Sequence, residues 1–325
     1  MDQLFEIGRK TYDTPEFRGI TFIESEAKSI INRVPGGALP FDWTINPYRG
    51  CSHACVYCFA RPTHTYLDMN AGRDFETKIV VKVNAPEVLR RELAAKRWKG
   101  EHIAMGTGTD PYQRAEGRYR LMRGIVEALI DHRNPFSILT KGTLILRDLD
   151  LLTQAAEVAP VSAAFSIGTL EEGVWRSTEP GTPHPRARIE AIRTLTEAGI
   201  PTGVLMAPIL PGISDRPEQL REVVEAAIDA GATHVSPILL HLRPGVREEF
   251  LPWLEEEHPD LVERYLQLYR HTYGPRAMRE GLGRQVTSMV AAAGGIRRGV
   301  EPARRFFRRD RERPQPQTAE QLRLL

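Results

Sequence analysis

All three cysteines of the sequence lie in one short segment, "CSHACVYC", at positions 51, 55 and 58. Thiolates are preferred ligands of soft metal centres, and zinc ions and iron–sulfur clusters are the usual centres that they hold. An odd number of cysteines crowded into one segment is not a disulfide framework. The segment therefore predicts a metal centre with Cys51, Cys55 and Cys58 as its ligands.

Three cysteines leave either kind of centre one ligand short. A structural zinc ion takes four ligands, and His53 inside the segment is close enough in sequence to be the fourth, although its position between Cys51 and Cys55 restricts its reach. A 4Fe–4S cluster also normally takes four cysteines, so one iron would have no protein ligand. An open iron is what an enzyme needs if substrate or cofactor is to bind the metal directly. From the residues alone, zinc remains an alternative.

The composition is that of an ordinary globular protein, with 41% hydrophobic and 26% charged residues among 325 and a formal net charge of +2. This near-neutral balance produces no general field that would attract nucleic acid or a membrane. No signal segment precedes the first elements, and no apolar run reaches the roughly 18 residues of a membrane span. We expect a cytoplasmic protein without a membrane partner, in which the thiols stay reduced.

Six short apolar runs alternate with amphipathic helical stretches between residues 41 and 243. The runs cover residues 42–48, 102–107, 136–140, 162–167, 202–210 and 234–240. The helical stretches cover residues 85–98, 118–132, 148–158, 186–199 and 217–231. Apolar residues in these stretches recur three and four positions apart, as at Ile189, Ile192 and Leu195. Strands that alternate with helices pair in parallel through right-handed crossovers, so the pattern predicts an α/β protein with a wound sheet or a barrel.

Several segments lie outside this alternation. Residues 79–83, "IVVKV", are expected to form an edge strand or an extended approach to the next helix. Residues 1–40 are expected to form a strap that leads into the domain. After residue 243 the pattern is helical, and the basic, proline-containing end is expected to be disordered or loosely packed.

"GCSHACVYC", with Tyr57 directly before the third cysteine, resembles the cluster-binding motif of radical S-adenosylmethionine enzymes. Between residues 43 and 240 the sequence resembles the spore photoproduct lyase-like family of that superfamily. The resemblance implies an incomplete parallel (β/α)6 barrel with an N-terminal strap and C-terminal helices. The corresponding boundaries are a strap at 1–40, a barrel core at 41–243, a helical extension at 244–294 and a basic tail at 295–325.

The chemistry implied by this resemblance explains the missing fourth ligand. A 4Fe–4S cluster would be held by the three cysteines, and S-adenosylmethionine would chelate the open iron through its amino and carboxylate groups. An electron from the reduced cluster would then cleave the sulfonium and give a 5′-deoxyadenosyl radical that abstracts hydrogen from the substrate. The resemblance also implies a reducing partner of the flavodoxin or ferredoxin type as electron donor.

The resemblance extends to residues that would contact the cofactor. In the family, these positions bind the methionine end, other cofactor groups or the adenine side, and Tyr57 packs on the cofactor. The matching residues are Tyr57, Thr109 and Asp110 in "GTGTDPYQ", Lys141 in "LTKG", Ser166 in "FSIG", and Ala207 and Ile209 in "MAPI". Four of them stand at or just beyond the C-terminal end of an expected strand, which is the edge where parallel β/α folds bind ligands.

One residue of the family's reaction is missing. Spore photoproduct lyase uses a further cysteine near the segment matching residues 105–110 to return a hydrogen atom to its product. Here that segment reads "MGTGTD" and contains no thiol. The substrate reaction is therefore expected to differ from that of the lyase, and no cysteine remains for a second cluster. Tyr112 is the tyrosine nearest in sequence that could replace the thiol as hydrogen donor.

Residues on the substrate side are less sharply indicated. Glu179 and Arg188 could form an ion pair that closes the cofactor site, and His241 and Arg243 follow the last strand at the mouth of the barrel. In the basic tail, arginines flank Phe306 and Phe307, a combination that can contact phosphates and stack on bases. Nucleic acid is therefore a candidate substrate. The competing hypothesis is a non-catalytic zinc or iron–sulfur module that binds nucleic acid.

Overall fold

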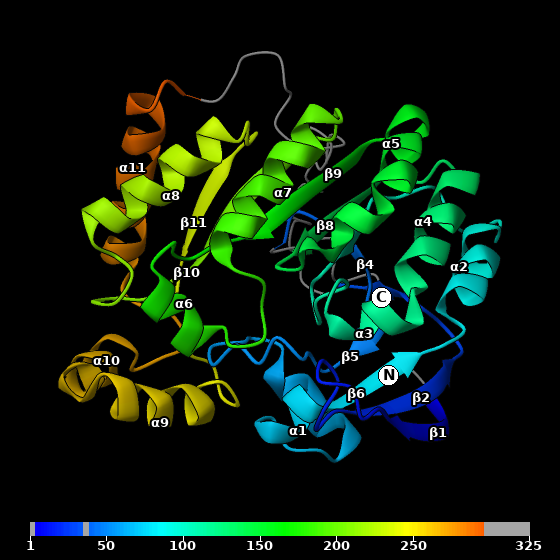
Figure 1. Cartoon of the computed structure of the whole chain (residues 1–325), viewed down its shortest axis with the longest axis horizontal. Coiled ribbons are helices and arrows are strands. Elements are labelled where there is room, and N and C mark those ends of the chain that lie inside the picture. The colour runs from blue at the N-terminus through cyan, green and yellow to red at the C-terminus, as the bar shows by residue number, and fades with distance from the viewer. Residues whose placement is uncertain (1–3, 35–38, 296–325) are drawn as a thin grey trace, which may run out of the picture.

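The computed structural model describes residues 4–34 and 39–295, and its larger sheet has seven strands in the order β11-β10-β9-β8-β7-β4-β3 (Figure 1). These strands are β3 (Ile31–Arg33), β4 (Trp43–Ile45), β7 (Ile103–Met105), β8 (Phe136–Thr140), β9 (Val161–Ser166), β10 (Thr202–Ile209) and β11 (Val235–Leu239). The six strands from β4 to β11 pair in parallel, and β3 pairs antiparallel with β4. This arrangement confirms the predicted α/β class and the partial barrel of six parallel strands. Five of the six expected apolar runs contain one of these strands, and the run at residues 162–167 overlaps β9.

Amphipathic helices cover the outer face of this sheet (Figure 1). They are α2 (Ala85–Leu93), α4 (Leu121–Asp131), α5 (Leu149–Val158), α7 (Pro185–Glu197) and α8 (Pro217–Asp229). Their apolar residues enter the main hydrophobic core, as Ile189, Ile192 and Leu195 of α7 do. Because residues three and four apart share one helix face, the periodicity in the sequence specified both the helices and the side that they bury.

A smaller sheet of four strands, in the order β1-β2-β6-β5, lies beside the barrel. Its strands are β1 (Leu4–Thr11), β2 (Thr21–Ala27), β5 (Tyr48–Arg49) and β6 (Lys78–Lys82). The run at residues 79–83 is extended as far as Lys82 and leads into α2 as expected, but an edge position was wrong, because β6 is an interior strand that pairs with β2 on one side and β5 on the other. Its run of apolar residues reflects burial within this second sheet. The strap expected at residues 1–40 contains β1, β2 and β3 in its described part.

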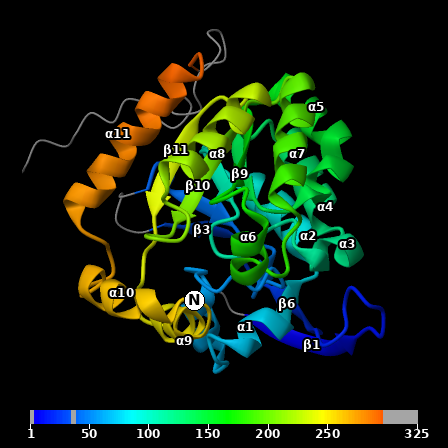
Figure 2. The same ribbon diagram turned by 60° about the vertical axis from the view of Figure 1, so that its left-hand side comes forward.

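The chain after the barrel is helical, with α9 (Arg247–Glu257), α10 (Val262–Leu268) and α11 (Arg276–Ala292). Figure 2 shows α11 alongside β11 and α8, at one end of the large sheet. None of the helices in the described ranges is long and apolar enough to cross a membrane. The predictions made for the basic tail, including Phe306 and Phe307, fall on residues 296–325, outside the described residues.

The remaining elements are short. They are the helices α1 (Arg73–Thr77), α3 (Arg114–Tyr119) and α6 (Glu172–Thr178), and the 3-10 helices η1 (Arg61–Leu67), η2 (Thr143–Asp148) and η3 (Pro259–Leu261). Three of them border the candidate site: η1 follows the cysteines directly, α3 follows the loop after β7, and α6 follows the loop after β9. The ends of the barrel strands and these short helices therefore surround the cysteine loop.

Candidate metal and cofactor site

The cysteine loop, residues 50–60, connects β5 to η1. Cys51 and Cys55 are buried, and Cys58 is partly exposed. Burial raises the pKa of all three thiols, and the charges of Asp110, Cys58 and Cys55 raise the pKa of Cys51 further. This mutual influence means that the three thiols share one small region. A bound metal would reverse the effect, because a coordinated thiol is deprotonated by the positive charge of the metal.

The donor set of this loop fits an iron–sulfur centre. No three Cys, His, Asp or Glu side chains within residues 4–34 and 39–295 lie close enough together to hold a single ion. Cysteines that bind an iron–sulfur cluster ligate separate irons, so they do not have to converge on one point as zinc ligands do. His53, the possible fourth ligand, lies instead beside Asp110, with Nδ1 3.3 Å from Oδ2. The loop thus offers three thiols, and the His53 imidazole is engaged elsewhere.

A buried glutamine fixes the backbone on both sides of Cys51. The Nε2 atom of Gln113 donates to the Gly50 carbonyl at 2.9 Å, and its Oε1 accepts from the Ser52 amide at 2.9 Å. The hydroxyl of Thr109 donates to the same Gly50 carbonyl at 2.6 Å. The sequence analysis missed Gln113, although it ends the segment "GTGTDPYQ" that was singled out. A side chain that both donates and accepts can hold two peptide groups at once.

The loop is also held by the last residue of α6 and the segment that follows it. The Val56 amide donates to the Thr178 carbonyl at 3.1 Å, and the Gly181 amide donates to the His53 carbonyl at 3.0 Å. A Cβ atom at Gly181 would lie 2.2 Å from the Ser52 carbonyl oxygen, so only glycine allows this approach. Segments more than 100 residues apart in sequence therefore enclose the cysteines.

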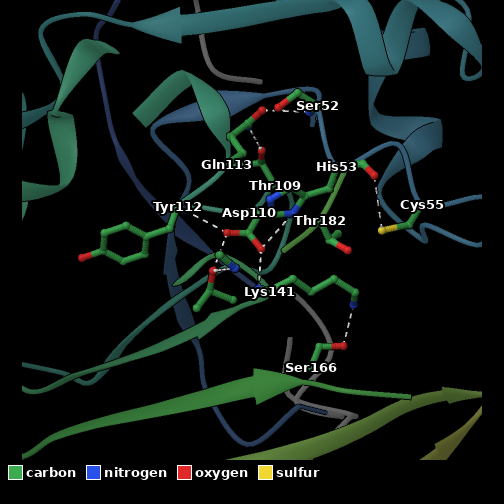
Figure 3. Close-up of polar contacts among 12 residues, drawn as sticks. Ser52, His53, Cys55, Thr109, Asp110, Tyr112, Gln113, Lys141, Ser166 and Thr182 are labelled. Carbon is green, nitrogen blue, oxygen red and sulfur yellow. Dashed lines mark hydrogen bonds and ion pairs between the residues drawn. The ribbon is translucent and has the colours of Figure 1, made fainter. Parts of the chain in front are cut away.

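Asp110 joins the loop after β7 to the end of β8. Its Oδ2 accepts from the Lys141 amide at 2.7 Å, and its Oδ1 accepts from the Thr140 hydroxyl at 2.6 Å and the Tyr112 amide at 2.9 Å. Burial raises the pKa of Asp110, but the nearby His53 and these hydrogen bonds outweigh burial and bring the pKa to about 2. Figure 3 shows the carboxylate at the centre of this network. Its predicted contact with the cofactor stays a prediction.

Because of this network, we expect the stability of the fold to fall at acid pH. Folding lowers the pKa of Asp110 from 3.8 to about 2, so the ionised carboxylate stabilises the fold above about pH 4, and this contribution is lost as the pH falls towards 2. For Asp110→Asn we expect about 2 kcal/mol less stability at pH 7 and a shallower loss of stability between pH 4 and 2. Urea unfolding of the metal-free protein across this pH range measures both. The exposed Asp131→Asn serves as the control, and equal slopes for Asp110→Asn and the unmodified protein would contradict this prediction.

The structure brings three of the predicted cofactor residues together. The Nζ of Lys141 donates to the Ser166 hydroxyl at 2.6 Å, and that hydroxyl donates to the Ala207 carbonyl at 2.7 Å. Figure 3 shows Lys141 extending from the Asp110 network towards Ser166. The ends of β8, β9 and β10 are thus joined by one chain of hydrogen bonds. Ile209, by contrast, is fully buried in the main hydrophobic core.

Glu179 places a buried carboxylate between the cysteine loop and the barrel. Its Oε2 accepts from Nη2 of Arg188 at 2.5 Å, so the ion pair hypothesised from the sequence is present. Its Oε1 accepts from the Tyr57 hydroxyl and lies 3.8 Å from Nζ of Lys141. Burial raises the pKa of Glu179, but Arg188 and Lys141 outweigh burial and lower the pKa to about 2. Glu179 is therefore ionised and connects Tyr57, Lys141 and Arg188.

Helices from the C-terminal region form another wall of the site. Tyr57 and Cys55 belong to a second hydrophobic cluster with Phe250 of α9 and Tyr265 of α10. The rings of Phe250 and Tyr265 stack with centroids 5.5 Å apart. Because α9 begins almost 200 residues after the cysteines, no local pattern in the sequence indicated this contact. The apolar wall shields the Cys55 side of the loop from water.

The residues after β11 meet the cysteine loop at its exposed end. Arg243 donates to the Phe59 carbonyl and lies over the Phe59 ring, with Cζ 5.7 Å from the centroid. His241 packs edge-on against Tyr273 at 4.6 Å. Phe59 and Tyr273 are 50% and 56% exposed. We call Phe59, His241, Arg243 and Tyr273 the mouth patch, because two of them directly follow the last barrel strand.

Tyr112 lies in a different direction. Figure 3 shows its ring pointing away from Lys141 and from Cys55. The charged groups that act on its hydroxyl are Asp148 and Arg147 of η2 and Glu116 of α3. The structure therefore does not support Tyr112 as a hydrogen donor to a substrate at the mouth.

Comparisons with known proteins agree with this geometry. The sequence model of the family described as the Radical SAM superfamily matches residues 45–227, which include all three cysteines. An uncharacterized protein of Mycobacterium tuberculosis is 50% identical over 279 residues, which are 85% of this chain and 82% of that protein. A radical SAM Nalpha-GlyT isomerase of Pseudomonas phage M6 is 27% identical over 58% of this chain and 37% of that protein.

Solved structures of spore photoproduct lyase share the fold. The structure of that lyase complexed with dinucleoside spore photoproduct superposes with a TM-score of 0.62 at 17% identity, and the match covers 86% of this chain and 83% of the lyase. At this level of identity the likeness concerns the arrangement of strands and helices.

Proposed function

Because the chain belongs to the radical SAM superfamily, we propose that Cys51, Cys55 and Cys58 hold a 4Fe–4S cluster at which the protein cleaves S-adenosylmethionine reductively. Membership itself implies an enzyme that uses S-adenosylmethionine and an iron–sulfur cluster. The observation that carries the finer proposal is the presence of three thiols, two of them buried, in one loop beside the hydrogen-bonded ends of β8, β9 and β10. When bound, the cluster supplies the electron that breaks the sulfonium and yields a 5′-deoxyadenosyl radical.

The charges around the loop suit a ligand with both a carboxylate and cationic groups. Lys141 supplies a cation in this space, 13% exposed, and we propose that it holds the cofactor's carboxylate. Glu179 is an ionised carboxylate next to Lys141 and faces the positive groups of such a ligand. The roles implied for the other residues remain part of the proposal: the methionine end of the cofactor at Thr109 and Asp110, and its adenine side at Ala207 and Ile209. Tyr57 would pack on the cofactor, and Ser166 would contact it at a position not further specified.

Exclusion of water is the second task of these residues. A carbon radical needs a dry site, because side reactions must be prevented while it lives. The second hydrophobic cluster covers the Cys55 side, and Arg188 and Glu179 fill the space behind Tyr57. A reducing protein of the flavodoxin or ferredoxin type is the electron donor that we propose, in a cytoplasmic setting where the thiols stay reduced.

Anaerobic reconstitution tests the proposal directly. Protein treated with iron and sulfide should turn brown and, with dithionite, convert S-adenosylmethionine to 5′-deoxyadenosine. A colourless zinc protein that leaves the cofactor unchanged would contradict the proposal and support the non-catalytic module instead. The superfamily match does not favour that alternative.

The substrate reaction differs from that of the lyase in the donor of the last hydrogen atom. Residues 105–110 contain no cysteine, and all three thiols of the chain are assigned to the cluster. The mouth patch supports nucleic acid as the substrate class, since exposed aromatic rings beside arginine can stack on bases and contact phosphate. A solved structure of spore photoproduct lyase, which shares the fold, is complexed with dinucleoside spore photoproduct, and this agrees with the proposal.

For Tyr273→Ala we expect about tenfold weaker binding of a single-stranded oligonucleotide at low salt, because one stacking contact is lost. Fluorescence anisotropy of a labelled 20-nucleotide DNA or RNA strand measures the affinity. Tyr66→Ala is the matched control, since Tyr66 is 76% exposed and lies outside the patch. Absence of binding by the unmodified protein would contradict nucleic acid as substrate and leave the cleavage of the cofactor untouched.

A further inference from the structure

Arg61 is a buried cation for which the proposed reaction has no role. Its side chain is 2% exposed, and it stands three residues after Cys58 in "CFAR". Burial of a guanidinium is unfavourable unless its donors are all used and its charge is paired. The contacts of Arg61 therefore show what its burial achieves.

The five N–H groups of the guanidinium match five contacts. Nε and Nη2 both donate to the Cys55 carbonyl, at 3.1 and 2.9 Å. Nη1 donates to the carbonyls of Ala71 and Gly72, at 3.1 and 3.2 Å. Nη2 also pairs with Glu76 of α1. A planar guanidinium that donates two hydrogen bonds to one carbonyl fixes the orientation of that peptide group as well as its position.

The same short helix anchors the other end of the loop. The Cys51 amide donates to the Phe75 carbonyl at 2.9 Å, and the Arg61 guanidinium lies 5.5 Å from the centroid of the Phe75 ring. Cys51 is thus attached to α1 through Phe75, and Cys55 is attached to α1 through Arg61. Because both cysteines are attached to α1, this helix fixes the spacing between Cys51 and Cys55.

The backbone between these anchors needs such support. Ala54 has a φ of 53°, in the left-handed region that residues with a Cβ atom seldom adopt. A backbone of this kind persists only where its surroundings hold it in place. Arg61 donates its two hydrogen bonds to the carbonyl of Cys55, the residue that directly follows Ala54.

We propose that Arg61 is a positioning residue for the candidate cluster: its guanidinium holds the Cys55 peptide and joins the loop to α1 before any metal binds. This inference rests on the proposed function. The positive charge of the guanidinium also acts on Cys58, and the ion pair with Glu76 balances it in part. Reduction of a bound cluster adds negative charge, so charge and hydrogen bonds near the loop influence its potential.

The first test is hydrogen exchange in the metal-free full-length chain. In Arg61→Met the amides of Cys51, Ala54, Val56 and Cys58 should exchange about tenfold faster, with a smaller increase in Arg61→Lys, which keeps the charge but cannot make five contacts. Arg123→Met is the matched control, because Arg123 of α4 is a partly buried arginine with two acidic partners, Asp148 and Asp150. Unchanged exchange in the loop of Arg61→Met overturns the proposal, and so does an equal increase throughout β8 and β9. If Arg61→Met cannot be purified, the smaller increase at the same amides must appear in Arg61→Lys, and its absence overturns the proposal.

The second test uses the reconstituted holoprotein and the midpoint potential of its cluster, followed by electron paramagnetic resonance. Arg61→Met should lower the potential, whereas Glu76→Gln, which leaves the guanidinium unbalanced, should raise it. A structural role alone would not shift the potential in opposite directions in the two variants. Shifts of the same sign, or no shift, therefore overturn the electrostatic part of the proposal. If the unmodified chain takes up no cluster, the proposed function fails, while hydrogen exchange still decides the role of Arg61.

Discussion

Replacing Cys55 with alanine is expected to remove the cluster and to lower the formation of 5′-deoxyadenosine by more than about 100-fold. The reason is the number of ligands: the chain has three cysteines in all, so no other thiol can take the vacant position. The change should be visible as loss of brown colour and of bound iron after anaerobic reconstitution. Iron and sulfide analysis, together with chromatographic detection of 5′-deoxyadenosine, measures the effect.

Ser52→Ala is the matched control for this experiment. Ser52 is buried in the same loop, and its hydroxyl has no hydrogen-bond partner among the described residues. Its loss should therefore leave iron content and product formation close to those of the unmodified protein. If Cys55→Ala retained both iron and cofactor cleavage, the assignment of the three cysteines as ligands would have to be abandoned.

The second large effect is expected from Arg188→Met, which should lower the free energy of unfolding by about 4 kcal/mol. Arg188 is 1% exposed, and the change leaves the carboxylate of Glu179 buried without its main partner. The pKa of Glu179 would then rise, because the larger of the two positive charges that oppose the effect of burial is gone. Arg188 also donates to the Ser166 carbonyl at 2.9 Å, so the end of β9 loses a contact as well. Urea unfolding of the metal-free protein measures the loss.

A neighbouring arginine on the same helix provides the comparison. Arg186 pairs with Glu222 at the surface, with side chains 62% and 48% exposed, so Arg186→Met should cost less than about 1 kcal/mol. Adding Glu179→Gln to Arg188→Met should restore part of the stability, since the buried carboxylate that lost its arginine partner is then neutral. Equal losses for the two arginine variants, or no recovery in the double variant, would show that the buried ion pair is not the cause.

Much of the fold was predictable because its signals are local. Apolar residues three and four apart, as in α7, specify a helix and its buried face, and short apolar runs specified the six barrel strands. The meeting of Lys141, Ser166 and Ala207 also followed from the sequence, because parallel strands end at a common edge. The spacing of the cysteines alone indicated a metal loop. None of these inferences needed knowledge of which side chains touch.

The tertiary structure decided what depends on orientation and on distant segments. Residue type and spacing did not reveal that Gln113 and Arg61 grip the cysteine loop, or that Tyr112 points away from it. The apolar run at residues 79–83 was recognisable, but its partners β2 and β5 were not, because strand pairing is a non-local contact. The contact of α9 and α10 with the cysteine loop could not be predicted either, because it is also non-local. Local periodicity determines which element forms, whereas the partners of a buried polar or apolar group are fixed only when the whole chain has packed around it.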